Sequence, residues 1–421
     1  MPENPLRHAV ARMGGRDPHE QNRASTPLEL FFDLTFAIAF GVAAGLFAQS
    51  LAEGHLGTGL ISFAFAMFAV IWAWINFSWF ASAYDTDDWV FRLVTMVQML
   101  GVLILAMGIE SMFSSIQAGE HVDNKVMVLG YVVMRVALLF QWLRAAKQDP
   151  RRRATCLRYA KYLAVAQAGW IVVLLVDTSV GVMFVLAAPL FLLEMATPLI
   201  AERKTRTPWH AHHIAERYSL LAIISLGECL VGTIDALRAV VLTHGWSPDT
   251  AVVGLAGTGL AFAMWWLYFI FPAGPALHLR RNRAFIFGYA HILIFASITA
   301  TGAGLRVYAL YLQGQTHIGP VAVVASVAVP VVLFAVTLTV LYAAMVQLEP
   351  LHVWLGVGLT TTSALAIVLA AAGLSLTLCL LLVLAAPAAT IVVDERVGHR
   401  HRARALAELG KHAGQPGPEQ A

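Results

Sequence analysis

Of the ionisable side chains inside long apolar runs, where a charge needs a partner or a proton, four are singled out as site candidates. They are Asp33, Arg135, Glu228 and His291. A charged side chain near the centre of a bilayer costs about 2.5 to 3.5 kcal/mol on insertion scales, so such residues face the interior of a helix bundle and pair there. His291 would either relay protons or hydrogen-bond a neighbouring helix, and both readings stay open. The four residues form a candidate intramembrane polar or ion-coupling site.

Arg135 restricts the pairing, because a guanidinium cannot neutralise itself by losing a proton. The candidate partners are Asp33, Glu194 and Glu228. Asp33 in turn needs a donor from another helix or a proton of its own. Glu228 is the strongest single functional candidate, and Asp235, seven residues further on, shares its helix face.

A second group of charged residues lies at the cytoplasmic ends of the first and seventh apolar runs. It comprises Glu29, His213, Glu216 and Arg217. Glu29 also follows Thr26 at the spacing of a capping box, so structural capping and a functional role are both open. His212 and Glu216 have the i,i+4 spacing of metal ligands, but two ligands do not make a site. The sequence therefore predicts neither a metal nor another cofactor.

The elements that must position these residues are membrane-spanning helices. Of the 421 residues, 59% are apolar and 13% are charged, whereas soluble domains have about 25% charged residues. This composition excludes a soluble enzyme. Apolar runs of about 20 residues predict an all-α, polytopic helix bundle. Twelve runs are expected, with ten or eleven as alternatives: 28–51, 57–83, 90–114, 125–145, 157–177, 180–200, 212–241, 250–271, 284–310, 319–346, 350–372 and 374–393.

The positions of basic residues predict the orientation of these spans. One set of loops and both chain ends hold 22 of the 28 Lys and Arg residues. Because basic loops stay in the cytoplasm, both termini are expected there, with the chain in the inner membrane. The expected parts are a basic arm over 1–26, a transmembrane domain over 27–393 and a disordered or surface-lying tail over 394–421.

The two halves of the transmembrane domain, 27–200 and 207–393, resemble each other in places. Trp74 and Arg92 are echoed by Trp265 and Arg283, each pair offset by 191 residues. Such a repeat would have six spans per half, and the first and seventh spans would then meet. The tryptophans at positions 72, 74 and 79 are interpreted as packing residues or interface anchors.

Several stretches resemble the bacterial low temperature requirement protein A (LtrA) family. They are TPLELFFDLTFAIAF, WAWINFSWFASAYDTDD, YVVMR and HHIAERYSLLAIISLGECLVG. The resemblance runs from about residue 25 to 390 and implies a multi-pass inner-membrane protein. The family's motif positions map onto Glu29, Phe32, Asp33, Arg135, His213, Glu216, Arg217, Gly227 and Glu228. Cys229 stands where the family commonly has serine.

Three functions fit these features. The preferred hypothesis is a secondary transporter, coupled to protons, with a small molecule or ion as its substrate. The alternatives are a non-transport membrane protein that supports growth in the cold and a membrane enzyme acting on a lipid-linked substrate. The sequence contains no GxxxxGK[ST], GxSxG or HExxH pattern, so no enzyme is expected. The expected partner is the lipid bilayer, and nucleic acid is not one.

Overall fold

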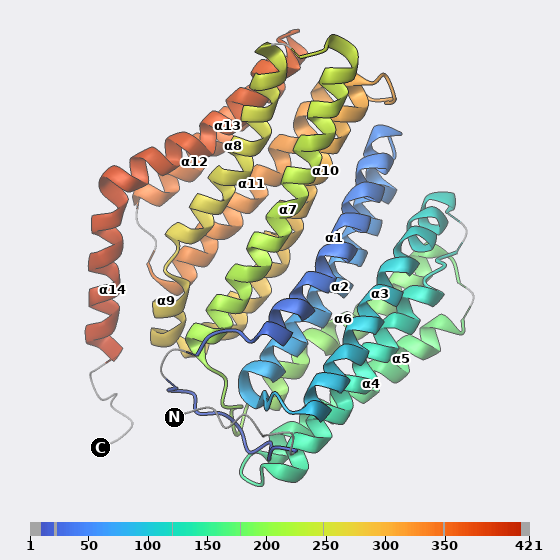
Figure 1. The fold of residues 1–421 in the computed structure, drawn as a ribbon, viewed down its shortest axis with the longest axis vertical. Helices are drawn as coiled ribbons and strands as arrows, with labels where there is room; N and C mark the ends of the chain where they lie inside the picture. Colours follow the sequence, from blue (N-terminus) through green and yellow to red (C-terminus); the bar gives the residue numbers. More distant parts are fainter. Residues whose placement is uncertain are drawn as a thin grey trace. The chain divides into compact units, whose positions relative to one another are not determined.

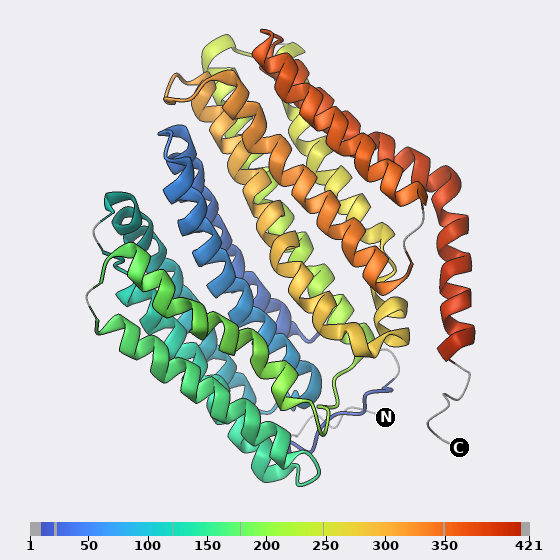
Figure 2. The same cartoon turned by 180° about the vertical axis from the view of Figure 1, so that it is seen from behind.

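The computed structural model describes residues 10–20, 23–119, 121–176, 178–246, 248–347 and 350–413. Within those ranges the chain is helical without a β-strand, which confirms the predicted all-α bundle (Figure 1, Figure 2). The helices are α1 (Pro27–Ala52), α2 (Leu56–Tyr84), α3 (Trp89–Ala118), α4 (Lys125–Gln148), α5 (Arg153–Leu174), α6 (Val180–Ala201), α7 (Ala211–His244), α8 (Pro248–Ile270), α9 (Ala273–Leu279), α10 (Ala284–Leu312), α11 (Pro320–Met345), α12 (Pro350–Ala371), α13 (Leu376–Val393) and α14 (His399–Ala413).

Each of the twelve predicted spans coincides with a helix. Among the described residues, eleven helices are long and apolar enough to cross a membrane. Helix α5 is not one of them, and Arg158 and Lys161 in its first half lower its hydropathy. The last two predicted spans are separate helices, because Gly373 makes a tight turn between them with a φ of 89°.

The chain divides into two compact units, and their boundary differs from the predicted halves. The first unit comprises Met1–Ala43 and Ile61–Arg217, and the second comprises Ala44–Leu60 and Tyr218–Ala421. The division therefore falls inside α7, and the end of α1 belongs to the second unit. One contact explains the latter assignment, since the Ala52 carbonyl accepts a 2.7 Å hydrogen bond from the His317 amide.

Each unit follows the same order of helix packing, as a repeat would. In the first, α3 packs on α4, α4 on α5 and α5 on α6. In the second, α10 packs on α11, α11 on α12 and α12 on α13. The first contact of each series requires a small residue. A Cβ added at Gly130 would meet the α3 backbone, and one added at Gly304 would meet the α11 backbone at Ser326.

The arm that precedes α1 lies against the first unit. The Ala11 amide donates to Asp88 Oδ2 over 3.0 Å, and the Met13 amide donates to Gln148 Oε1 over 2.6 Å. The Met13 side chain is buried. The Arg16 amide donates to the Ala83 carbonyl of α2 over 3.0 Å, so hydrogen bonds to three helices or their ends hold this segment in place. It is a structural part of the first unit. The first nine residues of the arm lie outside the described residues.

The tail is helical between residues 394 and 413, so the disordered alternative is wrong there, and the surface-lying one stays a prediction. A π-helical turn over Asp394–Gly398 continues α13 into α14 (Figure 1). Asp394 is buried and accepts a 2.6 Å bond from Arg402, while Trp266 donates to Glu395 over 3.0 Å. These contacts, one of them with a residue far away in the sequence, supply the order that the Arg- and His-rich composition did not indicate. Residues 414–421 lie outside the described residues.

Candidate functional site

Glu29 caps the start of α1, and its carboxylate also contacts α7. The Thr26 amide donates to Glu29 Oε2 over 2.9 Å, and the Glu29 amide donates to Thr26 Oγ1 over 3.3 Å, which closes the capping box. The same carboxylate reaches α7: Oε1 lies 2.8 Å from Arg217 Nη1, and Oε2 lies 3.2 Å from His213 Nε2. The capping residue is therefore also an ion-pair partner.

Asp33 lies one helical turn further along α1 and shares the same arginine. Arg217 Nη2 donates to Asp33 Oδ1, and Trp74 of α2 donates to the same oxygen over 2.6 Å. The Glu29, Asp33 and Arg217 side chains are all 0% exposed. We call Glu29, Asp33, His213 and Arg217 the Arg217 cluster. It joins α1 to the first turns of α7, as the repeat predicted for the first and seventh spans.

The Arg217 cluster contains two carboxylates and one guanidinium. If both acids are ionised and His213 is neutral, the buried group has a net charge of −1, which a buried site disfavours. Asp33 Oδ2 and His213 Nδ1 have no hydrogen-bond partner among the described residues. One proton on either group would bring the net charge of the cluster to zero. On Asp33 it would turn the buried carboxylate into a neutral hydrogen-bond donor, and on His213 it would turn the ring into a cation. Such an arrangement could bind one proton.

A further titratable group, Asp85, stands just beyond the end of α2. Burial and the charge of Glu29 raise the pKa of Asp85 to about 7, although the Asp87 amide donates to it over 2.8 Å. Its Oδ2 is buried without a hydrogen-bond partner among the described residues. Nearby, burial and the charge of Arg16 lower the pKa of Arg23 to about 10. The cluster thus has a neighbour outside the span that titrates near neutral pH.

Arg135 pairs with Glu194, one of its three predicted partners. Arg135 Nη2 lies 2.5 Å from Glu194 Oε2, and the two side chains are 3% and 7% exposed. Tyr131 accepts a further bond from the guanidinium, and Trp72 donates to Glu194 over 2.6 Å. One cation faces one carboxylate, so this pair is electrically balanced. The structure therefore separates the roles of Arg135 and Asp33, which the sequence had grouped together.

The tryptophans of α2 do more than the predicted packing or anchoring. Trp72 donates to Glu194, Trp74 to Asp33 and Trp79 to Glu202, the last over 2.9 Å. Glu202 also accepts bonds from Tyr159, over 3.0 Å, and from Thr207. Burial raises its pKa despite these donors. A buried indole N–H needs an acceptor, and this requirement was the signal that the sequence interpretation missed.

Glu228 lies in the second unit, where it pairs with Arg306 of α10. Arg306 Nη2 is 2.8 Å from Glu228 Oε2, and Arg306 Nε is 3.5 Å from Asp235 Oδ2. We call these three residues the Arg306 cluster. Glu228 and Asp235 do share a helix face, as their spacing predicts. Asp235 and Arg306 line a cavity of ≈ 600 Å³, which the sequence did not reveal.

His291 is held on both ring nitrogens within the second unit. Its Nε2 lies 2.9 Å from the Tyr268 hydroxyl, and its Nδ1 lies 2.7 Å from the Phe287 carbonyl. A carbonyl can only accept, which assigns the ring proton to Nδ1 and leaves Nε2 to accept from Tyr268. The ring is 0% exposed and packs against Tyr218. Of the two open readings, this geometry favours the interhelical hydrogen bond.

Glu216 of α7 contacts the arm that precedes α1 and is not a member of the Arg217 cluster. Its Oε1 accepts a 3.2 Å bond from the Ser25 amide and so ties the arm to α7. In the part of the chain that the structure describes, no group of three or more His, Cys, Asp or Glu side chains could hold a metal ion. The spacing of His212 and Glu216 thus gains no third ligand there.

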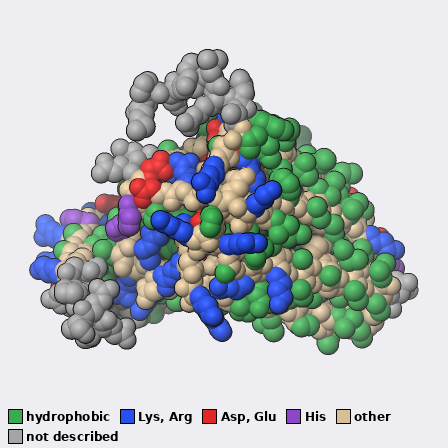
Figure 3. Space-filling model, turned by 90° about the horizontal axis from the view of Figure 1, so that it is seen from below, with side chains coloured by type: hydrophobic (Ala, Val, Ile, Leu, Met, Phe, Trp, Pro, Cys, Tyr) green, Lys and Arg blue, Asp and Glu red, His purple; other side chains and the backbone are tan. Residues whose placement is uncertain are grey.

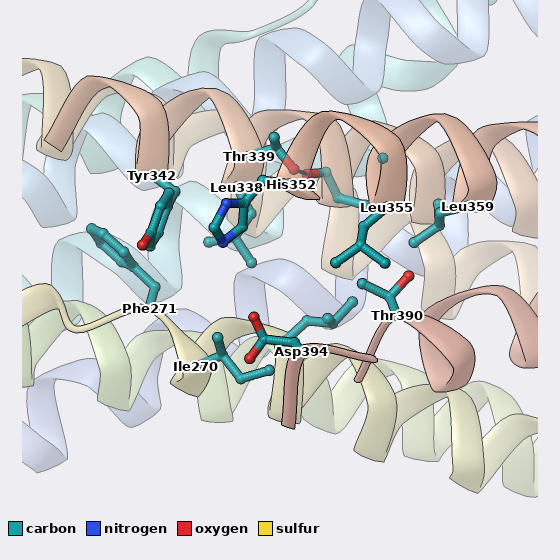
Figure 4. A pocket seen from close by; sticks show the side chains of 13 residues that line it. Ile270, Phe271, Leu338, Thr339, Tyr342, His352, Leu355, Leu359, Thr390 and Asp394 are labelled. Atoms are coloured by element: carbon teal, nitrogen blue, oxygen red, sulfur yellow. Dashed lines mark hydrogen bonds between the residues drawn. The ribbon is translucent and has the colours of Figure 1, made fainter. Parts of the chain in front are cut away.

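Figure 4 shows a second cavity of the second unit, a narrow space of ≈ 70 Å³ between α8, α11, α12 and α13. The His352 ring stacks on Tyr342 with 4.4 Å between centroids. Asp394 points toward the cavity, but it is already paired with Arg402. Leucines, Ile270 and Phe271 form most of the remaining wall. The cavity is small and largely apolar, and it offers no unpaired carboxylate.

Comparison with known proteins adds two findings. The profile of the family described as "Bacterial low temperature requirement A protein (LtrA)" matches residues 24–387. A protein of Rhizobium meliloti (strain 1021), described as "Uncharacterized protein RA0937", is 25% identical over 302 residues. That alignment covers 68% of this chain and 69% of the relative.

Proposed function

We propose that this chain, which belongs to the bacterial low temperature requirement A family, is a proton-coupled secondary transporter of a small molecule or ion. The observation that carries the proposal is the Arg217 cluster, in which two buried carboxylates share one guanidinium. A protein built only for stability would balance these charges, as the pair of Arg135 and Glu194 does. The unbalanced cluster holds a place for one proton.

The proton would change how α1 and α7 are held together. When Asp33 is ionised, it attracts Arg217 and competes with Glu29 for the same guanidinium. When Asp33 is protonated, that attraction weakens and Glu29 becomes the main partner. Binding and release of one proton thus shift the pairing between two helices, which is the kind of two-state element that coupled transport requires.

We place the protein in the inner membrane with both termini in the cytoplasm. This orientation needs an even number of spans, so α5 is proposed to cross the membrane as the twelfth. Figure 3 supports it, because Lys and Arg side chains gather on the end of the molecule seen there. We propose a carrier rather than an enzyme, with the lipid bilayer and a small solute as partners and no role for nucleic acid.

Proton flux in liposomes tests the proposal. The full-length protein is reconstituted around a pH-sensitive dye and offered separate panels of amino acids, organic acids, amines, sugars and metal salts. At least one panel is expected to drive a proton flux. The flux should fall at least about tenfold in Asp33→Asn, because an amide cannot exchange the coupled proton.

The matched control is Glu110→Gln, which neutralises an exposed carboxylate of α3. It should leave the flux unchanged. A protein that moves protons with none of the panels contradicts the proposal. So does a flux that survives unchanged in Asp33→Asn, provided that the variant inserts and purifies like the natural chain.

A further inference from the structure

The cavity beside the Arg306 cluster has the size and the polarity of a solute site. Its ≈ 600 Å³ lie within the range of about 300 to 1,000 Å³ that small-molecule pockets occupy. It is formed by the end of α1, the second half of α7 and the end of α10, all within the second unit. Its polar lining residues are Gln49, Glu53, Asp235, Arg238, Arg306, Gln313 and Gln315.

Some of these groups are already occupied by other side chains. Arg306 is held by Glu228 at 2.8 Å. Glu53 accepts a 3.0 Å bond from Gln49 and lies 3.5 Å from a ring nitrogen of His55. These contacts hold the side chains that line the cavity in place. They also leave less of the charge of Arg306 and Glu53 available to a ligand.

Two side chains of opposite charge, Arg238 and Asp235, remain able to bind a ligand. Arg238 is exposed and has no partner among the described residues. Asp235 is 38% exposed, and its contact with Arg306 is a loose one of 3.5 Å. The two residues are three apart on α7, which places their Cβ atoms about 5 to 6 Å from each other. One small solute can therefore reach both charges.

We propose that this cavity binds a small zwitterion of the amino-acid class, with its carboxylate on Arg238 and its ammonium on Asp235. An anion without an ammonium would leave Asp235 facing a like charge, and a cation without a carboxylate would do the same to Arg238. The glutamine amides can donate and accept around either end. The inference rests on the proposed transport function and names the substrate class that the carrier would take.

Equilibrium binding to the purified full-length protein tests this site. Each of the common L-amino acids is titrated by calorimetry, and each that binds is compared with its deaminated acid and its decarboxylated amine. At least one amino acid should bind saturably, and each single-charge analogue should bind at least about tenfold more weakly. Arg238→Ala should weaken the amino acid at least about tenfold and abolish the discrimination against the amine.

Asp235→Asn serves as the second variant, and it should abolish the discrimination against the deaminated acid. Arg206→Ala, at an exposed arginine outside the cavity, is the control and should bind normally. Binding of no amino acid overturns the proposal, as do equal affinities for the analogues or normal binding by Arg238→Ala. Because binding needs no proton flux, a protein that binds amino acids without moving protons would overturn only the proposed function.

Discussion

The Arg217 and Arg306 clusters contain the same charged groups, apart from His213 in the first, but differ in access to solvent. In each, two carboxylates on one helix share a single arginine from another: Glu29 and Asp33 with Arg217, and Glu228 and Asp235 with Arg306. The three ionic side chains of the first are 0% exposed, whereas Asp235 and Arg306 of the second line a cavity. A buried cluster must neutralise its extra negative charge internally, and a proton can do so. An open cluster can use water or a solute.

The largest expected effect is the loss of the buried arginine. Arg217→Leu leaves two carboxylates buried without a cation, so it should lower the free energy of unfolding by about 3 to 5 kcal/mol. Arg306→Leu removes the equivalent group beside a cavity, where Asp235 is 38% exposed, so it should cost less, about 1 to 3 kcal/mol. Denaturant unfolding in detergent measures both. Equal losses would show that access to the cavity does not distinguish the two clusters.

Next in size is the loss of the indole donor to Asp33. Trp74→Phe keeps most of the packing but removes a hydrogen bond to a buried carboxylate, which should cost about 1.5 to 3 kcal/mol. Trp265→Phe, at a side chain that is 42% exposed, should change stability by less than about 0.5 kcal/mol. The same unfolding assay compares them. A Trp74→Phe effect as small as the control would mean that the indole only packs.

The pH dependence of stability should report on Asp85, the titratable neighbour of the buried cluster. Its native pKa of about 7 lies above the ordinary 3.8, so the folded state holds this proton more tightly. The stability that Asp85 contributes is then fully present below about pH 4 and is lost as the pH rises from there to about 7, by about 1.4 kcal/mol per pH unit. Thermal unfolding from pH 5 to 8 measures it. Asp85→Asn should flatten this slope, and an unchanged slope would assign it to another group.

The smallest expected effect belongs to Glu228, the carboxylate of the second cluster whose arginine keeps a second acidic partner. Glu228→Gln should change stability by less than about 1 kcal/mol. In this variant Arg306 still has Asp235 as an acidic partner and still lies beside the cavity. Glu29→Gln should cost more, because it removes a fully buried partner of Arg217. Unfolding of the two variants side by side gives the measurement. The reverse order would contradict the contrast between the clusters.

Local sequence patterns predicted most of the fold and part of the candidate site. The apolar runs marked each long helix, the spacing of Thr26 and Glu29 predicted their capping box, and the need of Arg135 for a carboxylate included Glu194 among its partners. These inferences depend on residues close in sequence or on the cost of charge in a membrane. The helical tail was missed, because its order depends in part on a contact between residues far apart in sequence, Trp266 with Glu395.

The sequence by itself determined that this is a membrane protein of many helices and which of its residues carry costly charges. Hydropathy and formal charge are properties of each residue, so they can be counted along the chain. Only the tertiary structure decided that Asp33 shares Arg217 with Glu29, that Arg135 stands apart with Glu194, and that Glu228 neighbours a cavity. Which residues pair between helices far apart in sequence depends on how the helices pack. Packing also decides which clusters are shielded from water.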